Sequence, residues 1–260
     1  MLISIVSLNQ IWEDKKENFL LCEEYIKEAS TKNIELIIFP EMTLTGFSID
    51  IKKTSEDEAD SETINKFKKL SKNYNIAILF GIVIKDNEKA FNKSIFIDNK
   101  SNILGIYSKI HPFSLAGENK YFNSGDKLSI VDFNGIKIGL SICYDLRFPE
   151  LFSAYAKKSD LIINIANWPS KRVDHWKTLL KARAIENQIF IIGVNRRGKD
   201  DNGLEYTESS NIYNANGDIE NFENLKDMKI YCIDTKFTEN FKESFNTTND
   251  RKIKFYKGII

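Results

Sequence analysis

Residues 135–150 read Gly135-Ile-Lys-Ile-Gly-Leu-Ser-Ile-Cys143-Tyr-Asp-Leu-Arg-Phe-Pro-Glu150. Apolar side chains alternate from Ile136 to Ile142, and this period of two predicts a strand. The second half has a proline near the first turn of an apolar segment, which predicts a helix beginning at about Pro149. Cys143 therefore stands where a strand turns into a helix.

Such a turn exposes a side chain at the carboxyl edge of a sheet and points backbone N–H groups and a helix N-terminus toward it. We therefore expect a cysteine at this position to be stabilised as a thiolate. Most single cysteines are buried apolar fillers, and Cys22 and Cys232, in an expected helix and an expected strand, fit that description. Cys143 differs because the polar sequel Tyr-Asp-Leu-Arg follows its apolar strand directly, so it is the candidate nucleophile.

The composition narrows the class of protein. The 260 residues contain 37 Lys and Arg and 37 Asp and Glu, so nothing indicates a nucleic acid or an anionic membrane as partner. A small-molecule substrate is expected, with no cofactor, and the cysteines and histidines lack the spacing of metal ligands. Three cysteines argue against a disulfide framework and for a reducing compartment. The N-terminus lacks a signal-peptide pattern and apolar runs such as 76–84 are too short to span a bilayer, so a cytoplasmic location is expected.

Hydrophobic periodicity predicts an α/β fold in a single domain, 1–260, without internal repeats or linkers. Strands are predicted at 2–8, 33–39, 75–84, 91–97, 103–109, 128–133, 136–142, 161–166, 188–194, 209–213 and 229–234. Helices are predicted at 15–30, 62–73, 149–157 and 175–187. Asp174 is the expected N-cap of the last helix, Asn134-Gly135 the expected turn of a hairpin, and 113–125 an expected loop. The tail 241–260 has no clear periodicity.

Three reactive side chains each end an apolar strand, namely Glu41, Lys109 and Cys143. Alone, a glutamate or a lysine at such a place is usually a solvated surface residue. If the three strands share a sheet, however, the side chains meet at its rim, where α/β folds place their chemistry. Lys109 would then favour the thiolate and stabilise an oxyanion, while Glu41 would move protons. Cys143 would attack an electrophilic carbon.

Three blocks in chain order carry a resemblance to a known family: Phe39-Pro-Glu41 with Thr45-Gly46, Tyr107-Ser-Lys109-Ile-His111, and Cys143-Tyr-Asp-Leu-Arg-Phe-Pro-Glu150. Through them the chain, from its first strand to about residue 235, resembles the nitrilase, or carbon-nitrogen hydrolase, superfamily. The resemblance implies a four-layer α-β-β-α sandwich and a homodimer joined through helices beside the cysteine turn. The tail 241–260 is a candidate for covering a partner surface.

The resemblance also implies roles for the residues at the matching positions. Glu41 would be the general base and acid, Lys109 the oxyanion stabiliser and Cys143 the nucleophile. Glu118, in Ala-Gly-Glu, matches a second glutamate that positions the substrate and the lysine. The backbone N–H of Tyr144 would complete the oxyanion hole.

Within the superfamily, residues 166–188 look most like the omega-amidase branch through Ala166-Asn-Trp-Pro169, Arg172, His175-Trp176 and Ala182-Arg-Ala-Ile-Glu-Asn-Gln188. Enzymes of that branch hydrolyse the terminal amide of 2-oxoglutaramate or 2-oxosuccinamate. The far carboxylate of such a substrate needs a cationic partner. Arg172 and Arg147 are the candidates. His175 is expected to be a structural residue or a pocket wall, and Trp168 a pocket wall or part of the core. One departure is Glu208, where the resemblance leads us to expect a glycine.

Alternatives stay open at this point. A papain-like hydrolase would use His111 or His175 as the base for the cysteine. Arg147 can instead pair with Asp145 or Glu150 and brace the turn. Other linear amides or N-carbamoyl compounds can be the substrate, because a fold does not determine a substrate. The remote alternative is a non-catalytic binding protein on the same fold.

Overall fold

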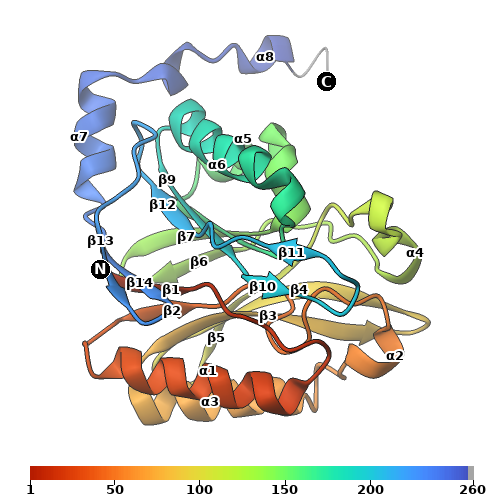
Figure 1. The fold of residues 1–260 in the computed structure, drawn as a ribbon. Helices are drawn as coiled ribbons and strands as arrows, with labels where there is room; N and C mark the ends of the chain where they lie inside the picture. Colours follow the sequence, from red (N-terminus) through yellow and green to blue (C-terminus); the bar gives the residue numbers. More distant parts are fainter. Residues whose placement is uncertain (257–260) are drawn as a thin grey trace.

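Two β-sheets form the centre of the structure, a computed structural model that describes residues 1–256 (Figure 1). The larger sheet has the strand order β13 (Phe222–Leu225), β14 (Met228–Cys232), β1 (Leu2–Val6), β2 (Leu36–Ile38), β3 (Ala77–Asp86), β4 (Lys89–Ile97) and β5 (Ile103–Ser108). The smaller sheet has the order β12 (Asn211–Tyr213), β9 (Phe190–Asn195), β8 (Leu161–Ala166), β7 (Ile136–Ile142) and β6 (Ile130–Phe133). The short strands β10 (Gly198–Lys199) and β11 (Glu205–Tyr206) form a separate ribbon.

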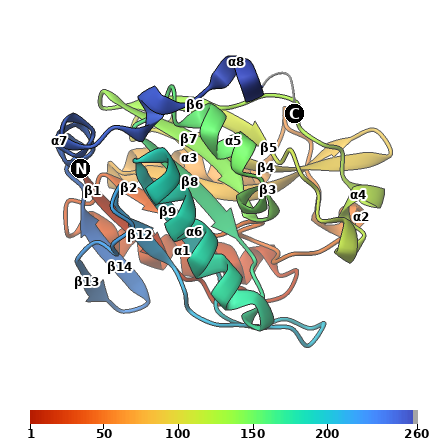
Figure 2. The same ribbon diagram turned by 90° about the horizontal axis from the view of Figure 1, so that it is seen from above.

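Helices cover the outer face of each sheet. The larger sheet carries α1 (Lys15–Ser30) and α3 (Glu62–Tyr74), and the smaller sheet carries α5 (Pro149–Tyr155) and α6 (Val173–Asn187) (Figure 1). Figure 2 shows α5 and α6 lying over the strands of the smaller sheet. The inner faces of both sheets share one apolar core. The expected four-layer α-β-β-α sandwich is thus confirmed.

The strand β8 shows why the central strands are continuous apolar runs. Leu161, Ile163 and Ile165 point into the core between the sheets, whereas Ile162 and Ala166 pack under the helices of the smaller sheet. A strand covered on both faces has no solvent-facing position, so its sequence does not alternate. Burial of each Leu or Ile side chain stabilises the fold by roughly 1.5–3 kcal/mol.

The predicted hairpin turn joins β6 and β7. Phe133 pairs with Ile136, so the connection has two residues, Asn134 and Gly135, with φ of 55° and 80°. Positive φ at both central residues suits the right-handed twist of the strands, and Asn-Gly adopts it readily. The turn therefore sets the register of the strand that leads to Cys143.

Some boundaries differ from the expectations. β2 keeps only three residues of the expected strand 33–39. The expected loop 113–125 contains the 3₁₀ helix η1 (Ser114–Ala116) and the short helix α4 (Glu118–Tyr121). Another short helix, α2 (Ile51–Thr54), was also absent from the expectations. Elements of three or four residues are too short to show a period in the sequence.

The start of α6 also corrects the prediction. The helix begins at Val173, and the N-cap position belongs to Arg172, which makes no side-chain capping bond. Asp174 lies inside the first turn, where its charge still complements the helix dipole. Within residues 1–256, neither this helix nor any other is long and apolar enough to cross a membrane.

The C-terminal tail has regular structure that its sequence pattern does not predict. It forms α7 (Lys236–Ser244), η4 (Thr247–Asp250) and α8 (Ile253–Tyr256), and Figure 1 shows α8 on the α5 and α6 side of the molecule. Arg251 anchors the tail, because its guanidinium donates to Glu186 O at 2.9 Å and to Asn187 Oδ1 at 3.1 Å. The end of the tail, 257–260, lies outside the described residues.

Candidate active site

Strand ends of both sheets meet at one edge of the sandwich. Glu41 follows β2 closely, Lys109 directly follows β5, and Cys143 directly follows β7 of the opposite sheet. Lys109 Nζ donates to Glu41 Oε1 at 2.9 Å. Asn167 connects Glu41 with Cys143, because its backbone N–H donates to Glu41 Oε2 at 2.9 Å and its backbone carbonyl oxygen lies 4.0 Å from Cys143 Sγ. The structure therefore brings together a carboxylate, an ammonium and a thiol from three strand ends.

A glycine allows the Glu41 backbone to reach this position. β2 and β5 are separated by β3 and β4, so at about 4.8 Å per strand their ends are roughly 14 Å apart. A Cβ at Gly81 of β3 would lie 2.3 Å from Met42 N and 2.9 Å from Glu41 Cα. Only glycine permits so close an approach, so the Glu41 segment can lie over β3 on the way to Lys109. This feature was absent from the sequence-based expectations.

Lys109 is a buried ammonium between two buried carboxylates. Besides its bond to Glu41, its Nζ donates to Glu118 Oε1 at 3.1 Å and Oε2 at 2.9 Å. Burial alone lowers the pKa of Lys109, but the charges of Glu118 and Glu41 raise it by more, so the pKa lies well above its ordinary value. The ammonium stays charged at neutral pH. Because it faces two carboxylates, the cluster carries an excess of negative charge.

Two amide groups complete the bonding of Glu41. Asn92 Nδ2 donates to Glu41 Oε1 at 2.7 Å and to Glu118 Oε1 at 3.0 Å. The second donor is the Asn167 backbone N–H already described. Sequence reasoning missed both contributions. The one available signal was the pair of polar residues Asn92 and Ser94 at alternate positions of an apolar strand, which indicates inward-facing polar side chains.

Cys143 begins the 3₁₀ helix η2 (Cys143–Arg147), which precedes the predicted helix at Pro149. Its φ of 46° lies in the left-handed region. Such a conformation costs a non-glycine residue on the order of 1–3 kcal/mol and is concentrated at functional sites. Tyr144 is the second residue of η2, so its N–H has no acceptor within that helix and is available to a ligand beside the sulfur.

The electrostatics around Cys143 oppose the expected stabilisation of a thiolate. Burial raises the pKa of Cys143 well above its ordinary value, and the Glu41 carboxylate raises it further. Lys109 acts in the opposite direction but does not outweigh them. The expectation failed because it counted the donors of the turn and the lysine, and not the burial or the excess of carboxylates.

Asp145 ties the cysteine turn to the end of β5. Its Oδ2 accepts from Ile142 N at 3.0 Å and from Tyr107 Oη at 2.8 Å. Its Oδ1 accepts from His111 N at 3.0 Å and lies 2.8 Å from His111 Nδ1. A fully buried carboxylate with these partners holds the ends of two strands from opposite sheets in one geometry. Its role was not foreseen from the sequence.

Neither histidine lies in the pocket beside the cysteine. The ring of His111 is engaged with Asp145 and stacks on Phe148 with the ring centroids 3.7 Å apart. His175 Nδ1 lies 3.3 Å from Arg147 Nη2 and is not part of the pocket lining. Of the two roles expected for His175, structural residue or pocket wall, the geometry favours the structural one. The papain-like alternative has no Cys–His pair in this geometry.

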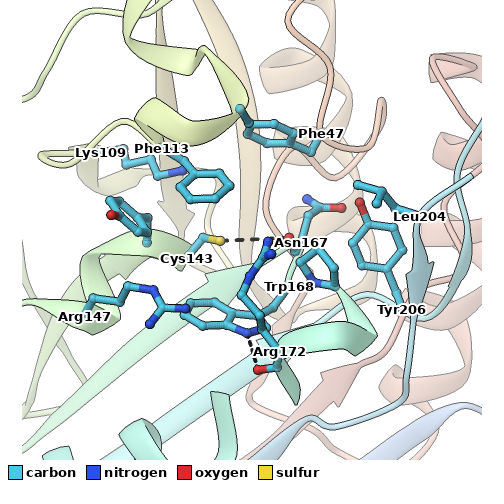
Figure 3. A pocket seen from close by; sticks show the side chains of 13 residues that line it. Phe47, Lys109, Phe113, Cys143, Arg147, Asn167, Trp168, Arg172, Leu204 and Tyr206 are labelled. Atoms are coloured by element: carbon cyan, nitrogen blue, oxygen red, sulfur yellow. Dashed lines mark hydrogen bonds between the residues drawn. The ribbon is translucent and has the colours of Figure 1, made fainter. Parts of the chain in front are cut away.

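A pocket of about 500 Å³, measured to its open mouth, leads to Cys143 and Lys109. Its aromatic and apolar walls come from several loops, and Figure 3 shows these side chains around the sulfur: Phe47, Phe113, Trp168, Leu204 and Tyr206. A mostly apolar cleft with a few polar groups at its centre suits a small molecule. Phe47, Phe113, Leu204 and Tyr206 were not among the predicted site residues, because nothing local distinguishes a wall aromatic from a core aromatic.

Two arginines line the same pocket, and neither has a carboxylate partner within the described residues. The Arg147 guanidinium lies over the Trp168 ring, 4.8 Å from its centroid, and the Arg172 guanidinium lies 5.5 Å from the Phe113 centroid (Figure 3). Stacking on a ring holds a guanidinium and leaves N–H donors for a ligand, although Nη2 of Arg147 also faces His175 Nδ1. Trp168 is both wall and core, since it is 3% exposed and its Nε1 donates to Arg172 O at 2.7 Å.

The departure at Glu208 leaves the local turn intact. Glu208 Oε1 accepts from Ser210 N at 3.2 Å and from Ser7 Oγ at 3.1 Å, and it lies 3.2 Å from Lys229 Nζ. The φ of Glu208 is not positive, so this backbone does not require a glycine.

The fold and the site together define a class of enzyme, a four-layer sandwich with a buried Glu-Lys-Glu cluster beside a cysteine. A family model described as Carbon-nitrogen hydrolase matches residues 2–228, and the chain belongs to this family. The protein is therefore a hydrolase that acts on amides.

Known relatives agree with the predicted branch. The chain is 34% identical to Omega-amidase YafV of Yersinia enterocolitica over 210 residues, 81% of this chain and 80% of the relative. It is 32% identical to 2-oxoglutaramate amidase of Bacillus subtilis over 198 residues, 75% of this chain and 76% of the relative. A solved CN-hydrolase superfamily protein of Xanthomonas campestris matches with a TM-score of 0.88 and 26% identity, over 97% of each chain. The resemblance to the nitrilase superfamily and its omega-amidase branch is confirmed.

Proposed function

We propose that the protein hydrolyses the terminal amide of small omega-amido keto acids, such as 2-oxoglutaramate and 2-oxosuccinamate, to the dicarboxylate and ammonia. The observation that carries the proposal is that Arg147 and Arg172, without carboxylate partners in the described residues, share a pocket with Cys143. A guanidinium matches a carboxylate in shape and charge. The relatives named omega-amidase and 2-oxoglutaramate amidase support the same substrate class.

The first half-reaction exchanges the C–N bond of the amide for a C–S bond. Cys143 Sγ attacks the amide carbon while its proton passes to Glu41. Lys109 Nζ and the Tyr144 N–H stabilise the negative charge that develops on the carbonyl oxygen. Glu41 then gives the proton to the nitrogen, ammonia leaves, and the acyl group remains on the sulfur as a thioester.

The second half-reaction hydrolyses that thioester. Glu41 takes a proton from a water molecule whose oxygen attacks the acyl carbon, and the same donors stabilise the oxyanion. The C–S bond breaks, Glu41 returns the proton to the sulfur, and the dicarboxylate leaves. One amide and one water thus give one carboxylic acid and one ammonia.

The electrostatics of the site support this distribution of roles. Because burial and Glu41 raise the pKa of Cys143, the sulfur attacks only as its proton leaves, and Glu41 is the carboxylate beside it. Lys109, whose pKa is raised, keeps its charge and suits an oxyanion partner better than a base. Glu118 binds the same ammonium through both oxygens and so holds it in place.

Release of ammonia from the two keto-acid amides tests the proposal, with wild type and Cys143→Ala compared side by side. Glutamine, asparagine and an N-carbamoyl amino acid serve as alternative substrates. Rapid release that depends on Cys143 and favours the keto-acid amides is expected. Cleavage of another amide alone would leave the triad standing and reject the substrate class, and no cleavage at all would favour a binding protein.

We also propose a homodimer in the cytoplasm. Exposed apolar side chains on α6 and the tail, Ile185, Phe245 and Phe255, support a partner surface on this side of the molecule. A reducing compartment would keep the nucleophilic thiol active. Sedimentation velocity tests the assembly, since a monomer at micromolar concentration would reject it.

A further inference from the structure

Asn92 lies on β4, between the strands whose ends supply Glu41 and Lys109. Its side chain is 1% exposed, and its Nδ2 donates to Glu41 Oε1 at 2.7 Å and to Glu118 Oε1 at 3.0 Å. Its backbone oxygen accepts from Lys109 N at 2.9 Å. One residue therefore contacts every member of the buried charge cluster.

The orientation of this amide has only one solution. Exchange of its nitrogen and oxygen would place the oxygen against two carboxylates, which is repulsive. In the observed orientation Oδ1 is buried and has no hydrogen-bond partner within residues 1–256. An unpaired buried acceptor is costly, and such groups call for a functional explanation. The functional explanation is that both N–H donors of the Asn92 amide are directed at carboxylates of the cluster.

We propose that Asn92 is a positioning residue of amide hydrolysis, which holds Glu41 and Glu118 on either side of Lys109 and keeps Glu41 able to accept the proton of Cys143. The inference rests on the proposed role of Glu41 as base. It assigns to β4 a part in the chemistry, although Asn92 does not line the pocket.

The physical reason is the repulsion between two carboxylates that share one cation. Like charges at such a distance favour retention of a proton by one of them. N–H donors offset this, because a hydrogen bond to the charged form stabilises that form. The cluster consists of Glu41, Glu118 and Lys109, and the titratable groups that face it are Cys143 and, near the thiol from the β11 side, Tyr206.

Asn164 offers a matched control. It is a fully buried strand asparagine of β8 whose Oδ1 is also unpaired within residues 1–256. Its Nδ2 donates to Ser141 Oγ at 3.0 Å and not to a carboxylate. Asn92→Leu and Asn164→Leu therefore remove the same buried amide in a similar setting, and only the first touches the charge cluster.

The experiment compares the two variants with wild type and Glu41→Gln. It measures kcat and KM for 2-oxosuccinamate against pH, and the rate at which iodoacetamide alkylates Cys143, identified by mass spectrometry, over the same pH range. For Asn92→Leu we expect kcat about 10–100-fold lower at neutral pH with little change in KM. The acid limb of the kcat profile should move to higher pH, and alkylation at neutral pH should be slower than in Asn164→Leu. Asn164→Leu should leave both midpoints unchanged.

An acid limb that stays in place in Asn92→Leu, whatever the loss of stability, would overturn the proposal. If that variant does not fold, Asn92→Ser removes the amide with a smaller disturbance. The position of its acid limb then supports or overturns the proposal in the same way. Iodoacetamide needs no keto-acid recognition. If both keto-acid amides are inert, the substrate class is rejected, and the alkylation rate of Asn92→Leu against that of Asn164→Leu remains the test of Asn92. If the pH profiles of Glu41→Gln are identical to those of wild type, the role of Glu41 as base is rejected.

Discussion

The pocket has two charged regions that differ in whether their charges are paired. The floor is the buried cluster of Lys109 with two glutamates, and the mouth is the pair of pocket arginines. At the floor, Lys109 and the oxygens of Glu41 and Glu118 all have buried hydrogen-bond partners. At the mouth, Arg147 and Arg172 lie over aromatic rings without a carboxylate partner among the described residues. The groups that carry the chemistry are thus held in place before the substrate binds. At the mouth, the carboxylate of the substrate would supply the missing partner of the guanidinium groups.

This contrast predicts that substitutions at the floor act on kcat and substitutions at the mouth act on KM. A change at the floor disturbs groups that act on the reacting atoms. A change at the mouth removes binding that the substrate and the transition state share, because the carboxylate is remote from the bond that breaks.

The largest effect should follow Glu41→Gln, which removes the proposed base. We expect kcat to fall by about 10³-fold or more, because general acid–base catalysis contributes roughly 10²–10⁴-fold and both half-reactions use this group. At the same time the pKa of Cys143 should fall, since the Glu41 charge that raises it is gone. Thiolate absorbance at 240 nm should therefore appear at lower pH than in wild type.

The double variant Glu41→Gln/Cys143→Ala is the control, because the absorbance of this one thiol should be missing from it. Turnover near that of wild type would remove Glu41 from its role. A thiol titration that does not move would show that the carboxylate is not what raises the pKa.

Gly81→Ala should have the next largest effect, although Gly81 touches no substrate. The added methyl group would meet Met42 N at 2.3 Å, so the Glu41 segment must shift. A displacement of about 1 Å can lower kcat roughly 10²-fold. Gly193→Ala is the matched control, because its Cβ would crowd Leu180 and Trp176 of α6 and leave the Glu41 segment untouched. Equal losses of kcat in the two variants would attribute the effect to instability.

At the mouth, Arg172→Ala should raise KM for the keto-acid amides about 10–100-fold with kcat almost unchanged, because one charge-assisted interaction is lost. Arg147→Ala should act in the same direction. Reactivity of Cys143 toward small thiol reagents should stay intact. Arg197→Ala, which removes an ion pair with Asp227 on the surface, is the control. A normal KM would exclude Arg172 as the carboxylate partner.

The smallest effects are expected at the histidines. His111→Ala removes a partner of buried Asp145 and should lower kcat by less than about tenfold, the result expected for a support that does not transfer protons. His175→Ala loosens only Arg147 and should alter KM by a few fold at most. Steady-state kinetics of both variants test whether a histidine acts as the base. Loss of turnover in either variant would support a Cys–His mechanism.

Periodicity along the chain was enough to predict most of the architecture. The strands 136–142 and 161–166 and the helix 15–30 match the observed bounds, because burial on one or two faces repeats at intervals that a short window of sequence contains. The same patterns placed Glu41, Lys109 and Cys143 at strand ends, and the family motifs followed from contiguous residues. The short elements α2 and η1 were not predicted, because they contain less than one clear repeat.

Packing of the two sheets established what no local pattern contains. Asn92 and Glu41 are 51 residues apart, and their bond exists because β4 lies beside the strand that Glu41 crosses. The need for glycine at Gly81 depends on a segment from another strand. The direction of the Cys143 pKa shift reflects burial and three charges from separate loops. Hydrogen bonds and electrostatic interactions depend on distances through space, so they are set only when the strand ends come together.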